Sequence, residues 1–288
     1  MNNLKELSEI AKQITKNLRY SFDCYIEEGS FKATFRIIDS SGLPLALKIY
    51  KPENCNLCRV NREIEAMLKC DSKYLSKLYH FNQIKINDVD YYFSVEKFFD
   101  GGTLTNRLTE TASDLHKTKK YALCLAEAIL HLKDNDLVHR DIKPDNIMFR
   151  SDDDAPVLID LGLVRNLMLK SLTNTWIPQG PGTPIFSSPE QLNNDKPLID
   201  WRSDQFSLGL VIGYMTLGRH AFERNPKNQQ EIVDIIAKRD SISDKFKKDI
   251  DAIGFSSVLK MLDPWPVNRY CSSQSLMIAL QNIQIKEK

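Results

Sequence analysis

The chain has 288 residues, which is enough to bury a large core as one domain or as two lobes. Its 42% hydrophobic and 27% charged residues are typical of a globular protein and argue against wholesale disorder. The 39 basic and 38 acidic residues nearly cancel, so no excess of positive charge indicates nucleic acid or an anionic membrane as a partner.

The pattern of apolar residues indicates neither a membrane-spanning segment nor a signal peptide. The longest uncharged apolar run, residues 206–218, is too short to span a bilayer. The first ten residues lack the apolar core of a signal peptide. Six scattered cysteines fit a reducing compartment, so we expect a cytoplasmic protein without a membrane segment.

The first twenty residues carry apolar side chains at steps of three and four: Leu4, Leu7, Ile10, Ile14 and Leu18. This spacing predicts an amphipathic helix. The simpler expectation is that its apolar face packs on the body of the protein. The alternative is a docking helix for a partner or for a second copy of the chain.

From residue 20 to residue 50 apolar and polar residues alternate, with turn signals at Glu28-Gly29 and Ser41-Gly42. The pattern predicts strands joined by hairpins. Residues 73–98 predict further strands, which end before a turn at residues 100–104. The helical spacing of apolar residues over residues 115–135 then predicts a buried helix.

A C-x-x-C pair, Cys55 and Cys58, lies just before NREIEAML at residues 61–68, where a helix is expected. A zinc site needs about four ligands, and only the isolated Cys70 and His80 follow. A redox pair is the other alternative. We expect two free thiols.

Two short motifs carry the chemistry: HRDIKPDN at residues 139–146 and IDLG at residues 159–162. The first places an acid (Asp141), a lysine (Lys143) and an amide (Asn146) within six residues, and the second adds Asp160. One carboxylate suits a substrate hydroxyl, the lysine suits a transferring phosphoryl group, and the amide with the second carboxylate suits a metal ion. These motifs indicate phosphate chemistry.

The order and spacing of the motifs resemble the eukaryotic-type (Hanks-type) serine/threonine protein kinases over about residues 20–280. Besides the two motifs above, the resemblance is carried by LALKIY, NREIEAML, GTPIFSSPE, SDQFSLG and DPWPVNR. It implies an α+β, bilobal fold. The expected parts are a helical extension at 1–19, a small, mainly antiparallel β lobe with one key helix at 20–99, and a larger helical lobe at 100–288 that contains an activation segment at 160–190.

The resemblance also implies roles for individual residues. Asp141, Lys143 and Asn146 would be catalytic, and Asn146 and Asp160 would hold the metal ion. Lys48, paired with Glu63, would hold the α- and β-phosphates. The other ATP-binding positions would be Gly29, Ser30, Ala46, Glu96, Phe98 and Met148. The shelf for the substrate would include Thr183 and Glu190. Structural support would come from His139, Arg140, Asp204 and Arg269. Of these, Asp204 would contact the backbone of the catalytic loop, and Arg269 would pair with Glu190.

The sequence departs from the family pattern in two places that matter. In YIEEGSFKATF only Gly29 remains of three expected glycines, and Glu27 and Lys32 occupy the outer two positions. A glycine permits the closest approach of backbone N–H groups to phosphate oxygens. The step from Glu96, in the expected hinge, to Gly101 is one residue longer than in the family.

Substrate class and control can be inferred from the same resemblance. Lys143 together with Gly182-Thr183-Pro184 resembles the serine/threonine-specific members. Arg140 in such a position pairs with a phosphate on the activation segment, and candidate phosphosites are Ser171, Thr173 and Thr175. We expect one of them to be phosphorylated by the enzyme itself; the alternative is that all three are simply polar loop residues.

The sequence thus predicts a cytoplasmic enzyme that transfers the γ-phosphoryl group of ATP to serine or threonine hydroxyls of proteins. Mg²⁺, for which Mn²⁺ can substitute, would be the metal. One alternative is a pseudokinase-type nucleotide-binding scaffold, supported by the degraded glycine loop. The other is a small-molecule phosphotransferase, against which the GTPIFSSPE segment and Arg269 favour protein substrates.

Overall fold

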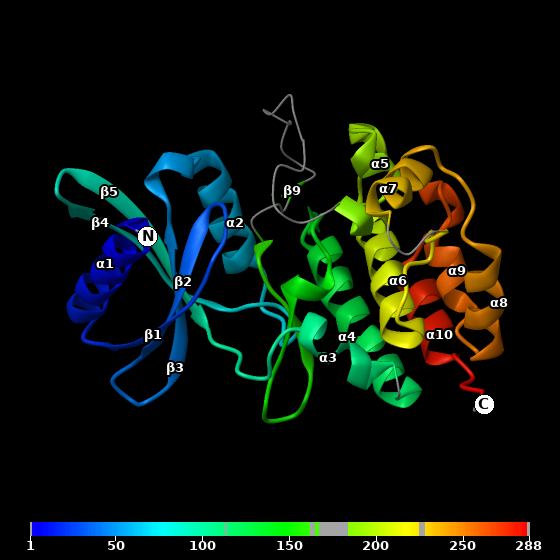
Figure 1. Ribbon diagram of the computed structural model, residues 1–288, viewed down its shortest axis with the longest axis horizontal. Helices are drawn as coiled ribbons and strands as arrows, with labels where there is room; N and C mark the ends of the chain where they lie inside the picture. The colour runs from blue at the N-terminus through cyan, green and yellow to red at the C-terminus, as the bar shows by residue number, and fades with distance from the viewer. Residues whose placement is uncertain (1, 113, 162–164, 167–183, 225–227, 287–288) are drawn as a thin grey trace. The chain divides into compact units, whose positions relative to one another are not determined.

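The computed structural model describes residues 2–112, 114–161, 165–166, 184–224 and 228–286. The chain divides into two compact units (Figure 1). The first comprises Met1–Asp71 and Ser76–Phe99, and the second Ser72–Leu75 and Asp100–Lys288. None of the helices in the described part of the chain combines the length and apolar character that crossing a membrane requires.

The first unit is built on a five-stranded antiparallel sheet in the order β1-β2-β3-β5-β4. Its strands are β1 (Ser21–Glu28), β2 (Lys32–Ile38), β3 (Pro44–Tyr50), β4 (Leu78–Ile86) and β5 (Val89–Lys97). The predicted turn signals lie at the tips of the first two hairpins. At the second tip the Asp39 carboxylate accepts the backbone N–H groups of Ser41 and Leu43.

The two faces of this sheet differ because side chains alternate along each strand. On one face Phe35, Leu47 and Val95 are buried beneath helix α1 (Asn2–Leu18). On the other face Tyr50 packs against helix α2 (Leu57–Lys69). Figure 1 shows the two helices on opposite sides of the sheet. The α2 face also carries the polar residues of strands β2, β3 and β5.

Helix α1 uses its apolar face within the first unit. Leu7, Ile10, Ala11 and Ile14 are all buried in the same cluster as Phe35. A docking helix would need this face to be free, so the structure favours the simpler of the two expectations for the first twenty residues.

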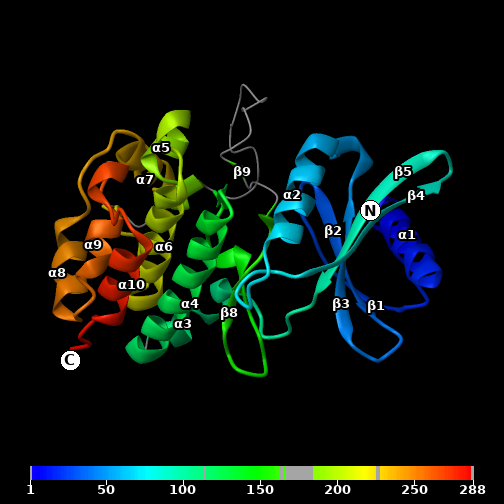
Figure 2. The same cartoon turned by 180° about the vertical axis from the view of Figure 1, so that it is seen from behind.

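The second unit is mainly helical and surrounds helix α6 (Trp201–Leu217) (Figure 2). This helix is buried on nearly all sides, and its second half is almost entirely apolar, which is typical of a central helix. It packs against α4 (Leu115–Asp134), the helix expected over residues 115–135. The others are α3 (Leu104–Thr111), α5 (Pro189–Leu192), α7 (Gln229–Ala237), α8 (Asp244–Ala252), α9 (Ser257–Met261) and α10 (Ser273–Gln281).

Two short strand pairs frame the chemical motifs in this unit. Strand β6 (Leu137–Val138) pairs with β9 (Arg165–Asn166), and β7 (Ile147–Phe149) pairs with β8 (Pro156–Leu158), all antiparallel. The loop of residues 139–146, named the catalytic loop after its expected role, therefore leaves one strand and enters another. The predicted combination of an antiparallel sheet with a larger helical part is confirmed.

Candidate active site

Asp204, in the first turn of α6, holds the start of the catalytic loop. Its carboxylate accepts the backbone N–H of His139 at 2.7 Å and that of Arg140 at 2.8 Å. Arg140 has a left-handed φ of 71°, an uncommon conformation that surrounding contacts must maintain. The expected contact of Asp204 with the loop backbone is present, and it fixes the residue that precedes Asp141.

The Asp141 carboxylate lies between an ammonium and an amide. The Lys143 Nζ lies 3.0 and 3.1 Å from its two oxygens, and the Asn146 Nδ2 donates to Oδ2 at 2.8 Å. Asn146 Nδ2 also donates to the Asp141 carbonyl, and the short 3₁₀ turn η2 (Pro144–Asn146) brings it there. The three residues that the motif predicted to act together therefore do touch one another.

Asn146 is oriented so that it could also bind a metal ion. Because Nδ2 faces Asp141, Oδ1 points elsewhere, and no donor in the described residues bonds to it. Amide and carboxylate oxygens are the ligands that Mg²⁺ prefers. The donor set of Asn146 and Asp160 thus fits a hard divalent cation.

Asp160 is tied to the catalytic loop through its neighbour Ile159. The Ile159 N–H donates to the Asn146 carbonyl at 2.9 Å, and the Ile159 carbonyl lies 3.2 Å from His139 Nε2. His139 Nδ1 accepts the Asp141 N–H at 3.3 Å. Burial lowers the pKa of His139 despite the nearby charges of Asp141 and Asp160. Because Nδ1 accepts a hydrogen bond, it carries no proton, and the imidazole connects the loop to the segment after β8 that carries Asp160.

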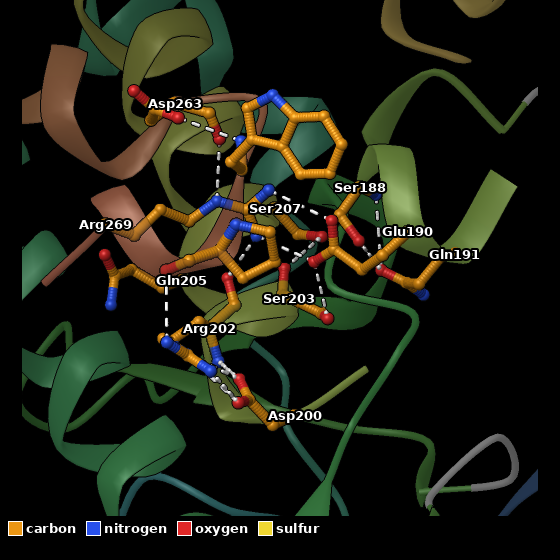
Figure 3. A network of polar contacts seen from close by, with 12 residues as sticks. Ser188, Glu190, Gln191, Asp200, Arg202, Ser203, Gln205, Ser207, Asp263 and Arg269 are labelled. Atoms are coloured by element: carbon orange, nitrogen blue, oxygen red, sulfur yellow. Dashed lines mark hydrogen bonds and ion pairs between the residues drawn. The ribbon is translucent and has the colours of Figure 1, made fainter. Parts of the chain in front are cut away.

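A buried ion pair supports the other side of the loop (Figure 3). Arg269 donates to both carboxylate oxygens of Glu190, at 2.7 and 3.0 Å, as the sequence analysis expected. Ser203 Oγ donates to Glu190 at 2.7 Å. The adjacent Gln191 donates from Nε2 to the Arg140 carbonyl at 2.9 Å. The segment around Glu190 thereby contacts the catalytic loop directly.

In the first unit the structure corrects one expected contact. Lys48 forms its ion pair with Glu96, at 2.7 Å, and not with Glu63. Glu63 instead lies 2.5 Å from the Nζ of Lys32 and accepts the Tyr50 hydroxyl at 3.1 Å. Lys48, Glu63 and Glu96 are all buried, so their partners are fixed by the side-chain geometry of the sheet and of α2.

Glu96 is also placed differently from the expected hinge. It lies inside strand β5, where it pairs with Ala46 of β3 and Leu78 of β4. The boundary between the two units falls later, between Phe99 and Asp100. This displacement agrees with the extra residue between Glu96 and Gly101. The Glu96 side chain points into the first unit toward Lys48.

The remaining expected nucleotide-binding positions are distributed over both units. Gly29 and Ser30 form the tip of the β1–β2 hairpin, and Ala46 is buried in β3. Phe98 stacks under the guanidinium of Arg36, and Met148 is half-buried in β7. Thr183 and the candidate phosphosites Ser171, Thr173 and Thr175 lie outside the described residues.

The fold requires a glycine at residue 101, which the sequence indicated only as part of a turn. A Cβ at this position would lie 2.5 Å from the Phe149 carbonyl oxygen. The Gly101 N–H donates to that same oxygen, and Gly102 accepts the Phe149 N–H. The missing side chain of Gly101 allows the backbone to pack directly on β7 at Phe149, and Gly102 supplies a left-handed φ of 76°.

The C-x-x-C pair forms no disulfide. Cys55 and Cys58 are free thiols, and burial raises the pKa of Cys55, opposite to what a reactive thiol needs. Within the described ranges no group of three or more His, Cys, Asp or Glu residues could hold a metal ion.

Sequence reasoning missed four residues that complete these sites: Lys32, Ser76, Ser94 and Gln191. Ser94 alternates with Glu96 in the segment 91–96, whose other residues are aromatic or apolar, and this polar pair on one face was the available signal. Lys32 was seen only as a missing glycine. Gln191 lies three residues after Ser188, which is the spacing of a capping box, and Ser76 carried no local signal.

The sequence model of the protein kinase domain matches residues 6–278, so the chain belongs to the protein kinase family. The two units accordingly have the bilobal architecture of a kinase domain. The family resemblance inferred from the motifs is confirmed.

Individual relatives are more distant. The chain is 26% identical over 273 residues to a calcium/calmodulin-dependent protein kinase of Metarhizium anisopliae, covering 91% of this chain and 67% of that protein. It is 27% identical to serine/threonine-protein kinase D of Synechocystis and 25% identical to a probable serine/threonine-protein kinase of Clostridium acetobutylicum. Each match covers 92% of this chain, but only 52% and 40%, respectively, of those two proteins.

Proposed function

We propose that the protein is a serine/threonine kinase that transfers the γ-phosphoryl group of ATP to hydroxyl groups of proteins. The observation that carries this proposal is the placement of Lys143 and Asn146 on the two sides of the Asp141 carboxylate. A carboxylate held in this way can orient a hydroxyl, while the adjacent ammonium neutralises charge on a phosphoryl group.

The reaction requires little covalent chemistry from the protein. The substrate hydroxyl oxygen forms a bond to the γ-phosphorus while the bond to the bridging oxygen of ADP breaks. Asp141 accepts or orients the hydroxyl proton. Lys143 binds the γ-phosphate, and Lys48 binds the α- and β-phosphates.

Asn146 and Asp160 would hold Mg²⁺, with Mn²⁺ as a substitute. The metal, when bound, neutralises charge on the phosphates. The position of Asp160 is fixed by the hydrogen bonds of Ile159 to Asn146 and His139. Both ligands therefore belong to one hydrogen-bonded unit together with Asp141.

The choice of a protein serine or threonine rests on three supports. The two bacterial relatives above are named as serine/threonine kinases. Lys143 and Thr183 match the serine/threonine-specific pattern. The Glu190–Arg269 pair fixes the segment that would form the shelf for a peptide. We further propose autophosphorylation at Ser171, Thr173 or Thr175, and action in the cytoplasm on protein partners.

One experiment separates this proposal from its rivals. The protein is incubated with labelled ATP, Mg²⁺, a generic protein substrate and a panel of small alcohols. Asp141→Asn should reduce label transfer by about 10²- to 10⁴-fold, the usual contribution of such a group. Asp145→Asn is the matched control, because Asp145 bonds to Thr105 and not to the Asp141 cluster.

Three outcomes would be informative. Label on protein serine or threonine that Asp141→Asn abolishes supports the proposal. Label on small molecules alone would indicate a small-molecule phosphotransferase. Binding of nucleotide without any transfer by the wild type would contradict the proposal and favour a scaffold. Mass spectrometry of the labelled protein locates any autophosphorylation on the three candidate residues.

A further inference from the structure

Lys48 and Glu96 share one face of the first unit's sheet. Lys48 lies opposite Ser94 across the β3–β5 pair, and Ala46 lies opposite Glu96. Residues paired in this way, and their neighbours two positions along, point to the same side of a sheet. The register of two strands therefore directs the Lys48 side chain toward the Glu96 carboxylate, at 2.7 Å.

The surroundings of the Glu96 carboxylate favour the binding of an ammonium group. Its carboxylate is 1% exposed and accepts hydroxyl hydrogen bonds from Ser76 at 3.0 Å and from Ser94 at 2.9 Å. Burial by itself would raise the pKa of Glu96, but Lys48 and Lys32 outweigh it and hold the pKa below its ordinary value. Each oxygen thus has a hydroxyl donor, and the ammonium neutralises the charge.

Glu63 has a different cation of its own. Lys32, from the start of β2, lies 2.5 Å from its carboxylate, and the Tyr50 hydroxyl donates to the other oxygen at 3.1 Å. Burial raises the pKa of Tyr50, so its hydroxyl keeps the proton that it donates. The Lys32 ammonium also lies 5.2 Å from the centre of the Tyr50 ring.

The two pairs compensate each other. Lys32 stands where the family has a glycine of the phosphate loop, and Glu96 stands in a buried strand. A carboxylate buried at residue 96 would be strongly unfavourable without a nearby ammonium, and Lys48 supplies one at 2.7 Å. Transfer of Lys48 to Glu63 would leave Glu96 buried with two hydroxyls alone. The arrangement therefore resists exchange of partners.

We infer that Glu96 is the residue that positions the Lys48 ammonium for nucleotide phosphates, and that Lys32 serves as the counter-ion of Glu63 in place of Lys48. The inference rests on the proposed function in that Lys48 is taken to bind phosphates. The hydrogen bond to Glu96 uses one of the three N–H donors of Lys48, and no other partner in the described residues takes the rest. Two donors remain for phosphate oxygens.

The first test measures stability and needs no activity. Lys48→Met and Glu96→Gln should each lower the Tm, because each leaves a buried partner unpaired. The double variant should melt at a higher temperature than either single variant. Lys48→Met and Glu63→Gln should be additive, because these residues share no contact. Two results would overturn the inference. One is that the Tm losses of Lys48→Met and Glu96→Gln simply add, and the other is that Glu63→Gln raises the Tm of Lys48→Met.

The second test measures binding of ADP, which retains the phosphates assigned to Lys48. Glu96→Gln should weaken ADP binding about tenfold, comparable to the loss of one charge-assisted contact. The matched control is Glu6→Gln, whose carboxylate accepts the Tyr91 hydroxyl in the same unit. It should leave ADP affinity within twofold of the wild type.

A further variant keeps the test decisive if Glu96→Gln does not fold. The Lys32→Gln/Glu63→Gln double variant removes the second pair as a whole and leaves Lys48 on Glu96. ADP affinity should stay within threefold of the wild type. A tenfold loss would show that Glu63 positions Lys48. If the wild type binds no nucleotide, the proposed function fails, while the Tm comparison still decides the pairing.

Discussion

Arg269 and Glu190 form an ion pair that is completely closed to solvent. Both side chains have no exposed surface, and the guanidinium donates to both carboxylate oxygens at 2.7 and 3.0 Å. Further N–H groups of Arg269 donate to the backbone carbonyls of Asp263 and Arg202. Because every charge is paired, the cost of burial is offset only while both partners are present.

Replacement of Arg269 by Met should therefore destabilise the second unit strongly. Loss of one partner from a buried pair costs about 3–5 kcal/mol, because the remaining carboxylate is stranded. Urea unfolding measures the change. The control is Arg219→Met, which breaks the partly exposed pair with Asp249 and should cost less than about 1 kcal/mol. Equal losses for the two variants would contradict the argument.

A second prediction concerns pH and His220. The buried imidazole donates from Nε2 toward the Ile185 carbonyl, at 2.9 Å, and accepts the Phe222 N–H on Nδ1. Burial lowers the pKa of His220 to about 4. A depressed pKa means that the folded state binds the proton less tightly than the unfolded state. The stability that this group contributes is present above about pH 6.5 and is lost as pH falls toward 4.

The magnitude follows from the two pKa values. At pH 5 the loss should be about 2 kcal/mol relative to pH 7.5. Asp204 also titrates differently in the folded state, because burial raises its pKa to about 7. Its effect on stability is opposite to that of His220: the stability that it contributes is lost as pH rises through 7. The difference between wild type and His220→Gln therefore isolates the histidine. The free energy of unfolding of His220→Gln should approach that of the wild type as pH falls. If the two free energies of unfolding instead differ by a constant amount at every pH, the prediction is refuted.

The contacts of the second unit were predictable because their residues belong to motifs of known order. Asp141, Lys143 and Asn146 lie within one loop, so local geometry brings them together. Asp204 and Arg269 are distant in sequence, and they were predicted only through the family resemblance. The strands, their hairpins and the helix over residues 115–135 followed from hydrophobic periodicity and turn signals, and the family resemblance added the antiparallel lobe.

The partner of Lys48 could not be predicted in the same way. It depends on the register of β3 against β5, which joins residues 48 positions apart. Periodicity places Glu96 on a face but does not say which strand lies beside it. The family pattern then favoured Glu63, and Lys32 was interpreted only as a lost glycine. Two charge changes that compensate each other are visible only once the side chains are placed.

The β1–β2 loop yields the last prediction, because its single glycine is not required by the fold. A Cβ at Gly29 would meet nothing closer than the Lys32 carbonyl oxygen at 3.7 Å, and the residue has no left-handed φ. Gly29→Ala should therefore change stability by less than about 0.5 kcal/mol. The Gly29 N–H itself donates to the Lys32 carbonyl oxygen at 2.8 Å. If the backbone at this hairpin tip approaches phosphate oxygens, a methyl group at residue 29 hinders that approach, and ATP affinity should fall several-fold.

Gly42→Ala provides the opposite pattern in the same unit. Gly42 lies at the β2–β3 turn with a φ of 89°, where a Cβ is strained although space around it is open. The substitution should cost about 1–2 kcal/mol of stability and leave ATP affinity unchanged. Calorimetric titration and thermal melting of both variants separate the two effects. Unchanged ATP affinity in Gly29→Ala would show that this loop does not bind phosphate, and that Lys48 on Glu96 carries that task in the first unit.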